Sequence, residues 1–295
     1  MLLSPQRAAR SALFVIAFAC AVPQYAAAAP KESLAEGDQG KIEFRTLTLT
    51  RDQFLSGSKA GKEIVISGRL NFPKTEGKVP GVIISHGGDG ISPSETGWAD
   101  DLRSIGVATF IVDSFSGRGI RGFPSESELS RRGQVLDLYR ALTLLATHPR
   151  IDAKRIALLG CSRGGGEAIL TSESARSPYF PQDVDFRAYI AVYPALPPDF
   201  NFATWELQPR PVRIFQGVID DVTPVAVARK FVEAQRAKGI DVKMFEYAGA
   251  HHAFDNPRLP PSASSRVGTV GYNGQAAAQA VKDVRETVRE IFGLK

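Results

Sequence analysis

Short apolar runs that end in glycine or in a polar residue recur along this chain, and segments with helical periodicity lie between them. The runs at residues 79–88 and 155–162 are almost continuously hydrophobic, which is typical of strands buried on both faces. Further strands are expected at residues 41–49, 63–73, 107–115, 188–195, 212–220 and 242–250. Strands that alternate with helices predict an α/β fold, in which a mostly parallel eight-stranded sheet carries helices on both faces.

The expected helices occupy residues 98–106, 125–149, 224–239 and 274–293. The first two strands are joined by a short link, so we expect them to form an antiparallel edge of the sheet. With 43% hydrophobic and 23% charged residues, the chain has the composition of an ordinary globular protein. Because no repeat, low-complexity tract or long linker follows residue 40, the sequence predicts a single domain.

The N-terminal segment has the three parts of a secretory signal. A basic start with Arg7 and Arg10 precedes the apolar run SALFVIAFACAV, and small residues follow in YAAAAP. We therefore expect a signal peptide at residues 1–28, cleaved after Ala28, and a domain at residues 29–295 that is periplasmic or secreted. Since the apolar run is too short for a comfortable membrane span, no stable membrane insertion is expected after cleavage; an uncleaved anchor is the alternative.

Cleavage after Ala28 changes two bulk properties of the chain. It removes two of the 36 basic residues and none of the 31 acidic ones, so the remaining positive charge is too small to indicate nucleic-acid binding. It also removes Cys20 and leaves Cys161 alone, which excludes an internal disulfide in the exported protein. With one cysteine and no His-x-x-x-His pattern, neither a metal nor a cofactor is expected. The sequence leaves the oligomeric state open.

The stretch IALLGCSRGGGEA places Ser162 between an apolar strand and a glycine-rich helix start. The pattern Gly160-x-Ser162-x-Gly164 in this context indicates a nucleophile elbow, a tight turn that projects the serine hydroxyl from the sheet. The glycines remove side chains that would collide with neighbouring backbone. Cys161 is then expected to point back into the sheet as a small buried apolar side chain. A purely structural turn between strand and helix is the alternative.

A serine nucleophile needs a base, and the base needs a carboxylate that orients it. His251 and His252 share the loop after the last predicted strand, and we favour His252 as the base. Asp220 and Asp221 follow the strand at residues 212–220, and we favour Asp220 because it is nearer the strand end. Asp221 is expected to cap the helix that follows.

The tetrahedral intermediate of such an enzyme requires two backbone donors. The amide of Arg163, the residue after the serine, is one candidate, and the amide of Gly88 after the strand at residues 79–88 is the other. His86 in the same loop is expected to be a structural hydrogen-bonding residue.

The loop at residues 115–132 is rich in arginine. Arg118 and Arg121 are candidates for binding a carboxylate on the substrate. The alternative is that these arginines are solvated or paired with Glu126 and Glu128.

Several segments together resemble the dienelactone hydrolase-like group of α/β-hydrolases: SGRLNFP, VIISHGG, VDSFSGRG, HPRIDAKRIALLGCSRGG, GVIDDVTP and YAGAHHAFD. They cover most of residues 60–255. The resemblance implies a Ser/Cys–Asp–His triad at Ser162, Asp220 and His252, in the chain order of that fold. The family pattern G-A-x-H-x-F supports His252 over His251. Dienelactone hydrolases proper have cysteine at the centre of the elbow, so Ser162 favours a general serine esterase.

The expected activity is hydrolysis of a small-molecule carboxylic ester or lactone through an acyl-serine intermediate. A peptidase of the prolyl oligopeptidase type is one alternative, although the domain that would select peptides is not visible in the sequence. A non-catalytic binding protein on a hydrolase scaffold is another. Because only a short segment separates residues 195 and 210, no large lid is expected over the cleft.

Overall fold

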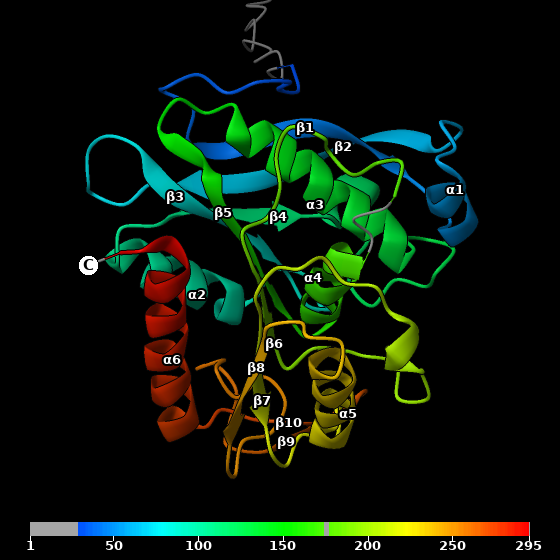
Figure 1. The fold of residues 1–295 in the computed structure, drawn as a ribbon, viewed down its shortest axis with the longest axis vertical. Coiled ribbons are helices and arrows are strands. Elements are labelled where there is room, and N and C mark those ends of the chain that lie inside the picture. Colours follow the sequence, from blue (N-terminus) through cyan, green and yellow to red (C-terminus); the bar gives the residue numbers. More distant parts are fainter. Residues whose placement is uncertain (1–28, 174–176, 295) are drawn as a thin grey trace, which may run out of the picture.

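The computed structural model describes residues 29–173 and 177–294, and an eight-stranded sheet forms its centre (Figure 1). The strand order is β1-β2-β4-β3-β5-β6-β7-β8. Neighbouring strands are parallel from β4 to β8, whereas β2 runs antiparallel to both β1 and β4. The strands are β1 (Gly40–Thr48), β2 (Lys62–Asn71), β3 (Val79–Ser85), β4 (Ala108–Asp113), β5 (Ile151–Cys161), β6 (Tyr189–Val192), β7 (Val212–Gly217) and β8 (Val242–Tyr247).

Helices cover both faces of this sheet, with α2 and α6 on one side and α3, α4 and α5 on the other (Figure 1). The helices are α1 (Arg51–Ser56), α2 (Pro93–Ser104), α3 (Arg131–Ala146), α4 (Arg163–Glu173), α5 (Val225–Arg236) and α6 (Gly274–Phe292). Short 3-10 turns lie at Ser116–Arg118 and Phe202–Thr204, and a hairpin of β9 (Ala263–Ser265) and β10 (Gly268–Val270) precedes α6.

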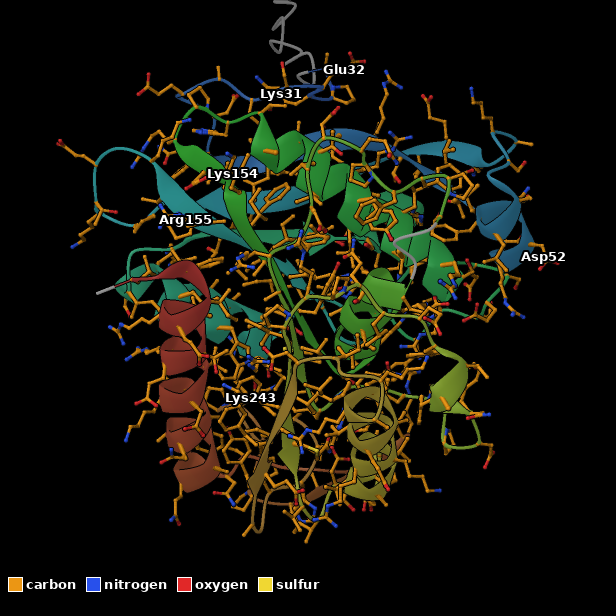
Figure 2. The ribbon with its side chains drawn as sticks, viewed as in Figure 1. Lys31, Glu32, Asp52, Lys154, Arg155 and Lys243 are labelled. Atoms are coloured by element: carbon orange, nitrogen blue, oxygen red, sulfur yellow. The ribbon has the colours of Figure 1, made fainter. Side chains whose placement is uncertain are left out.

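Burial on both faces explains why polar and apolar residues do not alternate along the central strands. Every residue of β3, β6 and β7 is buried, because each strand has a hydrogen-bonded neighbour on both sides and helices above and below. Most charged side chains lie at the periphery, as Figure 2 shows for Glu32 and Asp52, although Arg213 in β7 is buried.

Helix α6 illustrates how the sequence specifies the outer layer. Asn273 caps its first turn by accepting from the Ala276 amide, and Gly293 ends it at a φ of 62°. Apolar side chains at a four-residue spacing, including Ala280, Val284 and Val288, pack against the sheet.

The predicted fold class is confirmed: all eight predicted strands and all four predicted helices are present, with shifted ends. The antiparallel edge of β1 and β2 is confirmed as well, although their link contains α1. Helix α1 and the β9–β10 hairpin lie outside the predicted elements. The predicted signal peptide at residues 1–28 lies outside the described residues. In the part of the chain that the structure describes, no helix has the length and apolar character needed to cross a membrane.

Candidate active site

Ser162 occupies the tight turn between β5 and α4 with a φ of 54°, a region that residues other than glycine seldom adopt. Its amide donates to the Val192 carbonyl at 2.9 Å, and its own carbonyl accepts from the Gly166 and Ala195 amides at 3.0 and 2.9 Å. These three bonds hold the strained conformation in place. Cys161 beside it is buried, as predicted, and burial raises the pKa of its thiol well above the ordinary value.

Two glycines allow the backbone to pass this closely. A Cβ on Gly160 would lie 2.0 Å from the Gly164 carbonyl oxygen, and a Cβ on Gly164 would lie 2.3 Å from that of Ser85. Backbone atoms cannot move aside as a flexible side chain can. The elbow therefore requires glycine at both positions.

His252 lies in the loop after β8 and joins Ser162 to Asp220. Its Nε2 is 2.9 Å from the Ser162 Oγ, and its Nδ1 is 2.9 Å from Oδ2 of Asp220. The ring packs edge-on against Tyr193, with ring centroids 4.7 Å apart. The structure thus brings together the three side chains that the sequence singles out. His251 takes no part in this chain, and its Nδ1 is buried without a hydrogen-bond partner among the described residues.

The Asp220 carboxylate is held by several donors besides the imidazole. Oδ1 accepts from the amides of Val222 and Thr223 at 2.9 and 2.8 Å. Oδ2 accepts from the Thr223 hydroxyl at 2.8 Å and from the Gln216 side-chain amide at 3.2 Å. This network fixes the orientation of the carboxylate, so that Oδ2 faces His252.

The expected capping role of Asp221 is wrong. Helix α5 begins after Pro224 without a side-chain cap, and Asp221 turns instead toward the β9–β10 hairpin. Its carboxylate accepts from the amide and the hydroxyl of Thr269 at 2.8 and 2.9 Å. These hydrogen bonds lower the pKa of Asp221.

The loop after β3 approaches the serine closely. A Cβ on Gly87 would lie 3.5 Å from the Ser162 Cβ, and both Gly88 and Arg163 line the same cleft as Ser162. The Gly87 amide is already committed to the Glu95 carboxylate at 3.1 Å. Within residues 29–173 and 177–294, the amides of Gly88 and Arg163 donate to no protein acceptor. Their role as oxyanion donors stays a prediction.

His86 is buried beneath this loop and acts as a structural hydrogen-bonding residue. Its Nε2 accepts from the Ser114 amide at 3.3 Å, and its Nδ1 lies 2.8 Å from the Gly87 carbonyl. Burial lowers the pKa of this imidazole, so it is neutral at pH 7.

Two buried carboxylates that sequence reasoning missed lie behind the loop. Glu95 accepts from the amides of Gly87 and Ser92, and burial raises its pKa to about 7. Asp255 accepts from Ser94, Trp98 and Tyr193, and burial raises its pKa as well. The sequence holds a signal for Glu95, because SPSE at residues 92–95 is a capping-box pattern.

The predicted role of Arg118 in carboxylate binding is wrong. Its side chain is 4% exposed and pairs with Asp137 through two hydrogen bonds of 2.8 and 2.9 Å. It also donates to the Thr48 hydroxyl and the Ser114 carbonyl. The guanidinium is fully used in joining β1, α3 and the end of β4. Arg121 is exposed and does not line the cleft.

Among the described residues, three other arginines do line the cleft: one is Arg266 in the β9–β10 hairpin, and the remaining two are Arg131 and Arg163. Both face the buried Glu167, whose carboxylate lies 3.0 Å from Nε of Arg163 and 3.6 Å from Nε of Arg131. Burial raises the pKa of Glu167 to about 7. The positive charge of these two arginines is therefore partly neutralised by Glu167.

The cleft lies at the carboxyl ends of the parallel strands and has a volume of about 810 Å³. Its walls come from the loop after β3, Phe123 and Pro124, the start of α4, the loop after β8, and the β9–β10 hairpin. This size suits a small molecule.

Comparison with known proteins assigns the chain to a family. The model of the dienelactone hydrolase family matches residues 66–292. The solved structure named m3DLH has a TM-score of 0.62 at 20% identity, covering 86% of this chain and 99% of that one. The carboxylesterase Cest-2923 from Lactobacillus plantarum has a TM-score of 0.60 at 18% identity, covering 79% and 96%.

A curated relative matches over a shorter region. Thiohydrolase aneE of Aspergillus aculeatus is 28% identical over 105 residues, which are 35% of this chain and 32% of that protein. The chain thus matches about a third of this relative's length, whereas the family model spans most of the domain. On the strength of that match, this chain belongs to the dienelactone hydrolase family.

Proposed function

We propose that this protein hydrolyses carboxylic esters through an acyl-serine intermediate, with Ser162 as nucleophile, His252 as base and Asp220 as the carboxylate that orients the base. The observation that carries the proposal is the hydrogen-bonded chain of these side chains, with two contacts of 2.9 Å, at the floor of a small-molecule cleft. Membership of a hydrolase family supports it.

In the proposed reaction, the Ser162 Oγ attacks the ester carbonyl carbon while His252 Nε2 accepts the hydroxyl proton. The Asp220 carboxylate stabilises the imidazolium that forms. The amides of Gly88 and Arg163 donate to the oxyanion, and the N-terminus of α4 adds its dipole. The imidazolium then protonates the leaving alkoxide, and a water molecule activated by His252 hydrolyses the acyl-serine.

The residue at the elbow favours general esters over lactones as substrates. Serine rather than cysteine occupies the centre of the elbow. The similar structures include a carboxylesterase, and the curated relative is a thiohydrolase, so oxygen esters and thioesters both belong in the substrate panel. From the N-terminal pattern we further propose that the protein is exported to the periplasm or secreted, which N-terminal sequencing of the exported protein would test.

The test is hydrolysis of p-nitrophenyl acetate, a thioester, a lactone and a peptide anilide by the purified protein. We expect turnover of the ester, and loss of that turnover in Ser162→Ala. The matched control is Ser104→Ala, which removes an exposed hydroxyl on α2 that bonds only to its own helix. Turnover of the anilide alone, or full activity in Ser162→Ala, would overturn the proposal.

A further inference from the structure

The β9–β10 hairpin forms one wall of the cleft and is anchored beside the proposed base. Val270 pairs with His252 in an isolated β-bridge, and the Gly271 amide donates to the His252 carbonyl at 3.0 Å. Thr269 is bound to Asp221 through both its amide and its hydroxyl. The β10 strand is therefore tied to the loops that carry His252 and Asp220.

The tip of the hairpin reaches the opposite wall. The Arg266 guanidinium carbon lies 3.5 Å from the centroid of the Phe123 ring, and Nη2 lies 3.8 Å from Oδ1 of Asp89. Phe123 and Asp89 both belong to loops that precede Ser162 in the chain. Arg266 thus forms a bridge across the cleft, and this bridge consists of a single side chain.

The Phe123 ring is a fixed support for this bridge. Its backbone has a φ of 44°, and its amide donates to the Gly88 carbonyl at 2.5 Å. The ring fills the space beside Gly88, where a Cβ would lie 2.9 Å from the ring edge. Because the ring is packed on the loop that holds a proposed oxyanion donor, the movable partner in the contact is Arg266, whose side chain is 60% exposed.

The space between the two walls suits an uncharged, apolar group. Apolar side chains line it from both sides, namely Phe123, Pro124, Val222, Leu259, Val267 and Val270. The charge that Arg266 brings is met by Asp89. Neither wall therefore presents an unopposed charge at this point.

We propose that Arg266, closed against Phe123, sets the upper length of the apolar acyl group that the cleft accepts. This inference rests on the proposed ester hydrolysis. A short group fits between Ser162 and the bridge. A longer one must displace Arg266 from the ring and from Asp89, so its transition state loses those contacts and kcat/KM falls.

The test compares kcat/KM for p-nitrophenyl acetate, butyrate, octanoate and decanoate. Arg266→Ala should raise the ratio of octanoate to acetate about tenfold, the scale expected when a steric limit of a few methylene groups is removed. Phe123→Leu should shift the ratio in the same direction. The double variant should gain less than the product of the two single effects, because both changes open one contact. Arg51→Ala, which removes an equal charge from an exposed site on α1, should leave the ratio unchanged.

The outcomes separate the two proposals. If the wild-type protein cleaves none of these esters, the proposed function fails. If it cleaves short esters and the ratio is the same in Arg266→Ala, the inference about Arg266 fails while ester hydrolysis stands. If Arg266→Ala loses activity only toward an acidic ester such as p-nitrophenyl hemiglutarate, Arg266 binds anions and the proposed length limit is overturned.

Discussion

Replacing Arg118 with alanine should destabilise the fold rather than alter substrate binding. Among the described residues, the substitution would leave the Asp137 carboxylate, which is fully buried, with the Thr46 hydroxyl at 2.8 Å as its donor. The Ser114 carbonyl would also lose a donor. Removing one partner of a buried ion pair typically costs about 3–5 kcal/mol, and we expect a loss of that size in the free energy of unfolding.

The assay is urea denaturation followed by circular dichroism, with Arg121→Ala as the matched control. Arg121 lies three residues further along the same loop and is exposed, so its removal should change the free energy of unfolding by less than about 0.5 kcal/mol. The double variant of Arg118→Ala and Asp137→Ala should be destabilised by less than the sum of the single variants. The reasoning is refuted if Arg118→Ala is as stable as wild type and raises KM for acidic esters alone.

Three further predictions concern the site. Gly164→Ala should lower the free energy of unfolding by about 1–3 kcal/mol, because the added Cβ would lie 2.3 Å from the Ser85 carbonyl oxygen. The control Gly97→Ala adds a Cβ in open space on α2 and should not destabilise the protein. Equal melting temperatures for the two variants would contradict this prediction. Because the pKa of Glu95 rises from 4.5 to about 7 on folding, the native state binds its proton more tightly, and ionisation lowers stability as pH rises through this window. Glu95→Gln should remove about 3 kcal/mol of this pH-dependent loss of stability. The measurement is the free energy of unfolding as a function of pH, and equal slopes for the wild-type protein and Glu95→Gln would rule the effect out. Asp220→Asn should lower kcat by a factor on the order of 10⁴ in steady-state ester hydrolysis, and a loss below about tenfold would argue against its role.

The positions of Ser162, Asp220 and His252 could be predicted because each depends on local pattern. Each residue follows an apolar strand, and parallel strands bring their carboxyl ends to one edge of the sheet. The glycines around Ser162 add a backbone requirement that is visible in the sequence alone. Local pattern and one topological rule therefore located this part of the site, and the resemblance to the family pattern G-A-x-H-x-F supported His252 over the adjacent His251.

The role of Arg118 could not be predicted in the same way. Its charge suggested a ligand, but its surroundings depend on Asp137 in α3 and on the edge strand β1 packing over the same loop. The capping role expected for Asp221 failed for a related reason, since its partner Thr269 lies 48 residues further along the chain. Side chains with several suitable partners are assigned by tertiary packing, which a linear pattern does not contain.

The β9–β10 hairpin could not be predicted from hydrophobic periodicity. Its strands have three residues each, too few for alternation to stand out, and Arg266 contacts residues that are far away in sequence. The walls of the cleft follow from the structure rather than from the motifs.

Covalent labelling of Ser162 by a fluorophosphonate tests the central claim most directly. The hydrogen bond from Ser162 to His252 should make this hydroxyl far more reactive than the other serines of the folded protein. Intact-mass and peptide analysis should find one adduct, on Ser162, that is absent from denatured protein and from Ser162→Ala and forms more slowly in His252→Ala. A folded protein that takes up no label, or that is labelled on another serine at the same rate, would contradict the account.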